Sequence, residues 1–336
     1  MNSPDIGQTS IVTLQRGGGW RSIPNDRIAN EITKPNELLP LIQEIDAERG
    51  IYEIRYNNLR LTAKSETLLR SFSVATSQVL DYILFKATET GTPRDCFLIS
   101  VSDFMAWRGA RNRNNAARQL KEGLNTLYSI DLQYEMVSRK GKKRTALEEA
   151  LANLGSFRIL QNKPEIHQGM RNIPIFLGAA YFPVVKNTPP MAYHSILGKI
   201  NGQQNPFSYL IGRKILEHKD MGRKNSSAED TLSVATLFRK CHLPTYEQAS
   251  DAIRKDYTRR VINPFERDLN ALSEMCSWRY CLKGGAELPD GFAVAPKTFS
   301  SLLVRFSLKD YPKANARLPA HDAPEGVESD VERGVK

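Results

Sequence analysis

The sequence predicts an α+β fold in which one arrangement of elements occurs twice. Residues 120–127 and 265–272 share a helical spacing of apolar side chains, and both end in Leu-Asn-x-Leu. Each follows a short helix with a serine at its start, Ser102 or Ser233, and each precedes a segment typical of a strand. This spacing is far larger than that of solenoid repeats and indicates two related domains. A winged helix consists of a helix, a short helix, a longer basic helix and a hairpin, in that order. We therefore expect two tandem winged-helix (helix-turn-helix) domains with flexible N- and C-terminal extensions.

The length and composition suit two domains of ordinary size. Of the 336 residues, 40% are hydrophobic and 25% are charged, as in globular proteins. We divide the chain into a mostly irregular N-terminal extension (1–50), a first winged-helix domain with a basic wing insertion (51–187), a second winged-helix domain (188–312) and a tail (313–336). The tail is rich in Ala, Pro and acidic residues without periodicity, which predicts disorder.

The elements of the first domain follow from apolar periodicity and from capping residues. Alternation over 51–61 predicts a strand in which 57–58 could form a turn. Thr76 is a suitable N-cap for a helix over 76–88. The other expected elements are a short helix over 37–49, a strand over 97–101, helices over 102–107 and 114–128, a wing strand over 132–137, a helical insertion over 146–154, a strand over 157–160 and a strand over 172–185 that stops at Pro183.

The second domain is expected to repeat this order. Pro206 suits the first position of a helix, which we extend to Lys219, and Pro264 should bend the third helix or mark its start. The complete set is a helix over 191–200, a helix over 205–219, a polar loop over 220–230, helices over 233–241 and 245–254, a third helix over 259–275 and wing strands over 277–282 and 298–308.

Positive charge gathers where a winged helix meets DNA. The chain carries a net charge of +10, and 100–145 alone holds ten basic and four acidic side chains. A solvated charged face would explain one such cluster, but the cluster recurs with the apolar frame in the second copy. Arginine and asparagine make paired hydrogen bonds to guanine and adenine, and a basic wing suits phosphates or the minor groove. The predicted DNA-contacting residues are Arg111, Arg113, Asn114, Arg118, Lys121, Lys140, Lys142, Lys143, Arg144, Arg254, Lys255, Arg259, Arg260 and Arg267.

Motifs for catalysis are missing from the sequence. No two of the five histidines have the His-x-His or His-x-x-x-His spacing of a metal site, and no Gly-x-x-x-x-Gly-Lys-Ser/Thr loop is present. We therefore expect no enzyme activity, no cofactor and no metal. A relaxase or nuclease that uses a tyrosine is the rival hypothesis. The N-terminus lacks an export signal and no apolar run could span a membrane, so we expect a cytoplasmic protein without a membrane partner.

A resemblance to a known family rests on three runs of the second domain. Leu232-Ser233-Val234-Ala235-Thr236-Leu237, Leu243-Pro244-Thr245-Tyr246 and the run from Arg259 to Leu269 resemble the second DNA-binding domain of tandem winged-helix replication initiators of plasmids and other mobile elements. The similarity extends over about 60–310 and rests on pattern. It implies a protein that binds repeated double-stranded DNA sites at an origin, promotes local opening and recruits the host helicase, with a homodimer through the first domain. The alternative is a repressor of a mobile element without a replication role.

Overall fold

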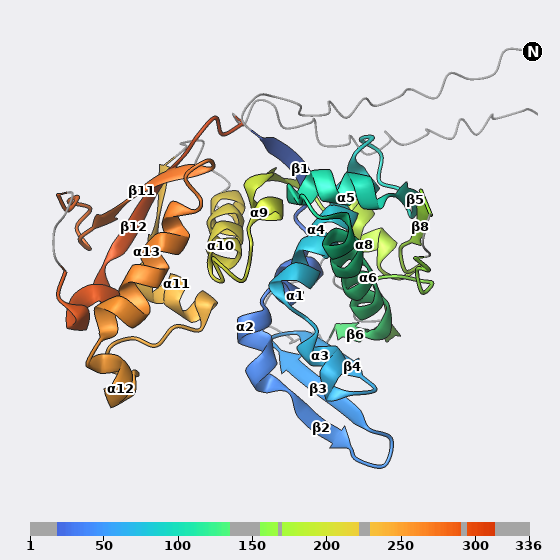
Figure 1. Cartoon of the computed structure of the whole chain (residues 1–336), viewed down its shortest axis with the longest axis horizontal. Coiled ribbons are helices and arrows are strands. Elements are labelled where there is room, and N and C mark those ends of the chain that lie inside the picture. The colour runs from blue at the N-terminus through green and yellow to red at the C-terminus, as the bar shows by residue number, and fades with distance from the viewer. Residues whose placement is uncertain (1–18, 135–154, 167–169, 222–228, 290–293, 313–336) are drawn as a thin grey trace, which may run out of the picture.

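The computed structural model describes residues 19–134, 155–166, 170–221, 229–289 and 294–312, and these form two tandem winged-helix domains (Figure 1). The first helix of each domain, α4 (Val74–Thr88) and α10 (Ser208–Met221), lies towards the middle of the molecule. The fold is therefore the α+β arrangement that the sequence predicts. Among the helices within the described ranges, none combines the length and apolarity needed to cross a membrane.

The first helix-turn-helix agrees closely with the sequence prediction. It consists of α4, α5 (Val101–Arg108) and α6 (Arg113–Ser129). The hydroxyl oxygen of Ser100 caps α5, and the side-chain amide oxygen of Asn112 caps α6. Gly109 ends α5 in the left-handed conformation, with φ of +58°, which glycine adopts without strain. The expected cap of α4 was wrong, because Ser73 rather than Thr76 accepts the hydrogen bond at its N-terminus.

Loss of the Ser100 cap should destabilise this helix-turn-helix. The Ser100 hydroxyl accepts a hydrogen bond of 3.0 Å from the amide of Asp103, which would otherwise have no helical partner. We expect Ser100→Ala to lower the free energy of unfolding by about 1 kcal/mol, and Ser100→Asp to lower it much less. Urea unfolding followed by circular dichroism measures both variants. An equal loss in the two variants would contradict the capping role.

A five-stranded antiparallel sheet carries the wing of the first domain. Its order is β2-β3-β4-β6-β7, with the following bounds: β2 (Gln43–Asp46), β3 (Ile51–Tyr56), β4 (Leu59–Ala63), β6 (Asp131–Tyr134) and β7 (Ser156–Phe157). The turn expected at 57–58 joins β3 to β4, and Asn57 takes a left-handed conformation there. β6 and β7 pair as wing strands. The predicted helical insertion over 146–154 lies outside the described residues.

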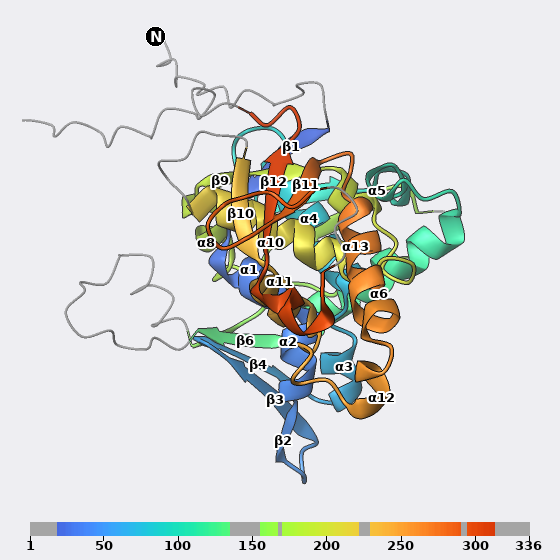
Figure 2. The same ribbon diagram turned by 90° about the vertical axis from the view of Figure 1, so that its left-hand side faces the viewer.

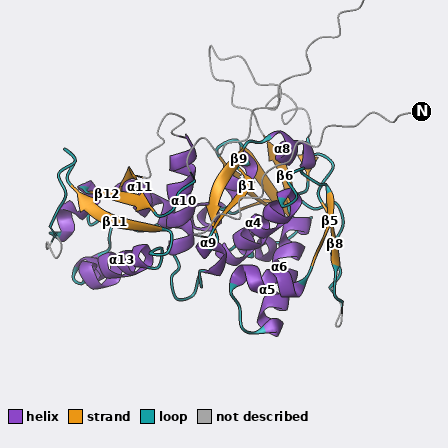
Figure 3. Cartoon of the chain, turned by 90° about the horizontal axis from the view of Figure 1, so that it is seen from above, coloured by secondary structure: helices purple, strands orange, loops and turns teal. Residues whose placement is uncertain are grey.

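A separate ribbon of β5 (Cys96–Ile99) and β8 (Ile173–Phe176) lies at the far edge of this domain (Figure 3). The strand predicted over 172–185 was wrong in its second half. After β8 the chain turns into α8 (Phe182–Asn187), which has Pro183 in its first turn. Proline suits this position because the amide it lacks would have no partner in the helix, so Pro183 begins a helix instead of stopping a strand.

The N-terminal segment 20–46 is ordered, in contrast to the mostly irregular extension predicted for 1–50. It forms β1 (Trp20–Pro24), α1 (Arg27–Ile32), α2 (Pro35–Leu38), the short 3-10 helix η1 (Leu39–Leu41) and β2. β1 pairs antiparallel with β9 (Pro190–His194), so residues distant in sequence decide both conformations. This pairing also explains why the helix predicted over 191–200 was wrong: only α9 (Ile196–Lys199) is helical there.

The second domain is a winged helix with a three-stranded sheet of order β10-β12-β11. Its elements are β10 (Glu229–Ser233), α11 (Val234–Cys241), α12 (Asp251–Arg254), the π-helical turn η2 (Thr258–Ile262), α13 (Asn263–Asn270), β11 (Cys276–Cys281), the 3-10 helix η3 (Pro296–Ser301) and β12 (Leu303–Leu308). Pro264 lies in the first turn of α13 and so marks the start of this helix, as expected. Other bounds need correction. α10 begins at Ser208 rather than 205, only 251–254 is helical within the range 245–254, the third helix ends at Asn270 rather than 275, and η3 replaces the first part of the strand expected over 298–308.

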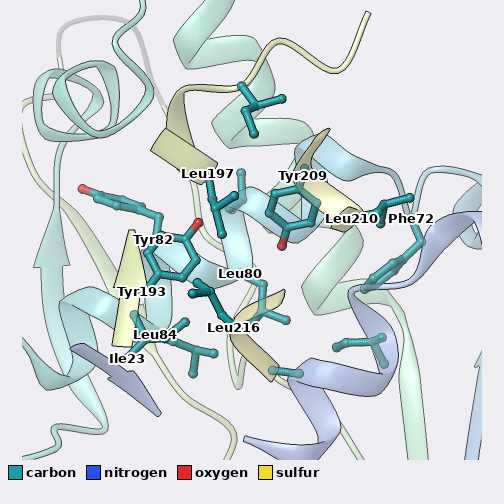
Figure 4. Close-up of a cluster of buried hydrophobic side chains, with 14 of the residues drawn as sticks. Ile23, Phe72, Leu80, Tyr82, Leu84, Tyr193, Leu197, Tyr209, Leu210 and Leu216 are labelled. Atoms are coloured by element: carbon teal, nitrogen blue, oxygen red, sulfur yellow. The ribbon is translucent and has the colours of Figure 1, made fainter. Parts of the chain in front are cut away.

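The hydrophobic core continues from one domain into the other. Figure 4 shows Leu80 and Tyr82 of α4 close to Tyr193 of β9 and to Tyr209 and Leu216 of α10. All five side chains are at most 2% exposed. Because burial of apolar surface is the main stabilising contribution to folding, the two domains are held together by the same interaction that holds each of them.

Candidate nucleic-acid interface

The third helices of the two domains, α6 and α13, lie on the same side of the molecule. Figure 2 shows α5, α6, α12 and α13 towards one side, with α8 and β9 on the other. Figure 3, seen from above, likewise places α5, α6 and α13 along one edge. The third helix of a winged helix usually enters the major groove, so a single duplex could contact both helices on this side.

The apolar face of α6 fixes its basic face towards solvent. Leu120 and Leu124 are fully buried, and a Cβ atom at Gly123 would lie 2.7 Å from Val79 Cγ2 of α4. α6 therefore packs directly on α4 at this point. The predicted DNA-contacting residues here are all exposed, namely Arg111, Arg113, Asn114, Arg118 and Lys121.

The charged groups on α6 have weak partners. Arg118 lies 3.2 Å from Glu122, but both side chains are more than 60% exposed, so the pair contributes little to stability. Arg113 donates a long hydrogen bond of 3.3 Å to Ser102 Oγ. Both guanidinium groups could therefore exchange their present partner for a phosphate or a base at small cost.

The basic residues of the second domain divide into two groups. Lys255, Arg259 and Arg260 are exposed, and the two arginines face Asp256. Arg254 instead donates to the main-chain oxygens of Tyr246 and Glu247, which holds the loop between α11 and α12. Arg254 therefore has a structural function that the charge pattern does not reveal, and its predicted DNA contact stays a prediction.

Arg267 neutralises a buried carboxylate. Asp268 is fully buried, and its Oδ1 atom accepts hydrogen bonds of 3.1 and 2.9 Å from Arg267. Its Oδ2 atom accepts from the amides of Phe207 and Ser208, at 2.6 and 3.1 Å, and so caps α10. The Arg267 side chain is still 54% exposed, so it can contact DNA while it balances Asp268.

The wing residues Lys140, Lys142, Lys143 and Arg144 lie outside the described residues. Sequence analysis also missed Lys199, which is exposed at the end of α9. Its Cγ atom lies 3.4 Å from the position of a Cβ atom at Gly109, in the turn between α5 and α6. Nothing in the local sequence shows this, because the tertiary fold brings Lys199 to the turn. Within the described ranges, no group of three or more His, Cys, Asp or Glu could hold a metal ion.

Comparison with known proteins gives similarity in structure only. No protein-family model matches the chain, and no curated protein matches it. The Pi initiator protein, solved in complex with iteron DNA, is 14% identical with a TM-score of 0.48, over 88% of this chain and 99% of that one. Domains 2 and 3 of RctB are 11% identical with a TM-score of 0.41, over 89% and 94% of the two chains. At these values the similarity by itself assigns no function.

Proposed function

We propose that the chain is a sequence-specific double-stranded DNA-binding replication initiator in which α6 and α13 read adjacent segments of one repeated origin site. The observation that carries the proposal is that α6 and α13 lie on the same side of the molecule and that exposed basic side chains accompany both. Several lie on or beside α6, Arg267 lies on α13, and Arg259 and Arg260 lie in η2 just before α13. Lysine and arginine bind phosphates, and arginine and asparagine distinguish base pairs in the major groove.

The proposal has further parts that rest on the resemblance of the sequence to plasmid initiators. These parts are local opening of the origin, recruitment of the host helicase and a homodimer through the first domain. We also propose that DNA binding itself is the activity, without catalysis by the chain and without a cofactor. A repressor of a mobile element would use the same surface, so a functional assay must separate the two.

A mobility-shift assay on fragments that flank the gene tests DNA binding. We expect discrete shifted bands on a fragment with direct repeats, with dissociation constants on the order of 10⁻⁸ to 10⁻¹¹ M. Affinity should fall steeply from about 50 to 200 mM salt, because each phosphate contact releases counterions. Weak binding that is equal on all fragments and is lost at moderate salt would contradict the proposal.

Plasmid replication separates the initiator from the repressor. A plasmid that carries the repeats should replicate only in cells that supply the chain. Replication that proceeds equally well in its absence would favour the repressor. Incubation of supercoiled DNA with the chain and Mg²⁺ should leave the DNA intact, and a nicked or covalently bound product would show catalysis.

A further inference from the structure

The segment that connects the two domains, residues 201–207, starts against the first helix-turn-helix. Arg108, the last residue of α5, donates hydrogen bonds to the main-chain oxygens of Gly198 (2.5 Å) and Ile200 (3.2 Å). The Gln78 amide of α4 donates to those of Leu197 (2.7 Å) and Ile200 (3.1 Å). The last carbonyls of a helix have no partner within it, so these side chains anchor the end of α9 beside the turn between α5 and α6.

The same segment ends against the third helix of the second domain. Asp268 of α13 accepts the amides of Phe207 and Ser208, and the Ser208 hydroxyl donates to the main-chain oxygen of Asp268 at 2.9 Å. In Figure 1 the chain leads from α9 to the lower end of α10, between the helices of the two domains. The connecting segment therefore runs from the first helix-turn-helix, beside the turn that precedes α6, to α13 of the second domain.

The connecting segment is an ordered turn with exposed amides. The Asn201 main-chain oxygen accepts the amides of Gln204 and Asn205, at 3.1 and 2.9 Å, and its side chain accepts that of Gln203 at 3.0 Å. Asn201, Gln203 and Gln204 are exposed, as is Lys199 just before them. The sequence contains no Asp or Glu from 187 to 216, so no carboxylate of this stretch repels a phosphate.

We propose that the connecting segment is a third DNA-contacting element, in which Gln203 and Gln204 contact the minor groove and Lys199 a phosphate. The inference rests on the proposed function. Adjacent major grooves on one side of a duplex are about 34 Å apart, and the minor groove faces that side between them. Its acceptors on A·T pairs suit the amides of glutamine and asparagine. The segment thus adds a preference for A·T pairs between the two major-groove sites.

Methylation interference on the bound repeat tests the inference, because dimethyl sulfate modifies guanine N7 in the major groove and adenine N3 in the minor groove. With the wild-type chain, adenine N3 methylation between the two major-groove sites should reduce binding. With Gln203→Ala/Gln204→Ala this interference should disappear, while guanine interference at the flanking sites persists. Replacing the intervening A·T pairs by G·C should cost the wild type about tenfold in affinity and the double variant much less.

Lys199→Ala should weaken binding to all fragments equally and reduce the slope of affinity against salt by about one phosphate contact. The matched control for the glutamine variant is Gln161→Ala, since Gln161 is exposed near β8 and away from the connecting segment. It should leave the binding unchanged. If the wild type binds a repeat but Lys199→Ala keeps its salt slope and Gln203→Ala/Gln204→Ala keeps its adenine interference, the inference is wrong and the proposed function stands. If the wild type binds no repeat specifically, the proposed function fails and the inference with it.

Discussion

Arg213→Met should destabilise the chain by about 3–5 kcal/mol, because it leaves a buried carboxylate without its partner. Arg213 of α10 lies 3.2 Å from Asp81 of α4, and their side chains are 1% and 0% exposed. The Tyr209 hydroxyl donates to the same carboxylate at 2.8 Å, and Arg213 also donates to Asn30 Oδ1 at 2.8 Å. The pair thus links both domains and the N-terminal segment. Urea unfolding measures the loss.

The stability of the Arg213→Met variant should depend on pH through the ionisation of the Asp81 carboxyl group. Burial raises the pKa of Asp81, while Arg213 and the hydrogen bond from Tyr209 oppose the rise. Without Arg213 the pKa in the folded state should rise further above the unfolded value of about 3.9. The loss in free energy of unfolding relative to the wild type should therefore be smallest below about pH 3.9, where the Asp81 carboxyl is protonated in the folded and unfolded states. The loss should grow as the pH rises.

A double variant provides the control for this prediction. Asp81→Leu/Arg213→Met removes both charges and should recover much of the stability, since apolar replacement of a buried pair is often neutral. Asp81→Leu alone should be strongly destabilising, because it leaves the guanidinium buried and unpaired. A loss below about 1 kcal/mol for Arg213→Met would mean that water reaches the pair and that the interface between the domains is open in solution.

Arg260→Glu should remove most of the specific DNA binding. The Arg260 side chain is 52% exposed and lies 3.9 Å from Asp256, so no strong interaction holds it in the free protein. Loss of an arginine contact to a base costs about 1–3 kcal/mol, and the introduced carboxylate adds repulsion from the phosphates. Titration by mobility shift should show the loss on the specific repeat. Unchanged affinity would mean that η2, the turn just before α13, does not contact DNA.

The matched controls separate binding from folding. Lys186→Glu makes the same charge change at an exposed residue of α8, a helix on the side away from α6 and α13, and should retain specific binding. Arg267→Glu is a poorer test, because it also removes the partner of buried Asp268 and so lowers stability. Charge reversal at Arg260 and Arg267 together should abolish specific binding. Of the two single variants, only Arg260→Glu should weaken specific binding with the unfolding midpoint unchanged.

Local chemistry made much of the helix-turn-helix predictable. α5 and α6 match the predicted ranges to within one residue at each end, because their caps and apolar spacing act over three or four positions. The surface positions of α6 were predictable for the same reason, since the residues between its buried positions must face solvent. The charge pattern did not separate Arg254, which binds main-chain oxygens, from Arg260.

The sequence by itself determined that there are two winged helices, where α5 and α6 begin and which faces of α6 are apolar. These properties depend on neighbours within a few residues. Only the tertiary structure decided that β1 pairs with β9 and that Asp81 forms an ion pair with Arg213. It also decided that Asp268 caps α10 and accepts hydrogen bonds from Arg267. Each of these joins residues distant in the chain, so the energy of a pairing, a buried charge or a cap depends on which partner the fold brings within contact distance.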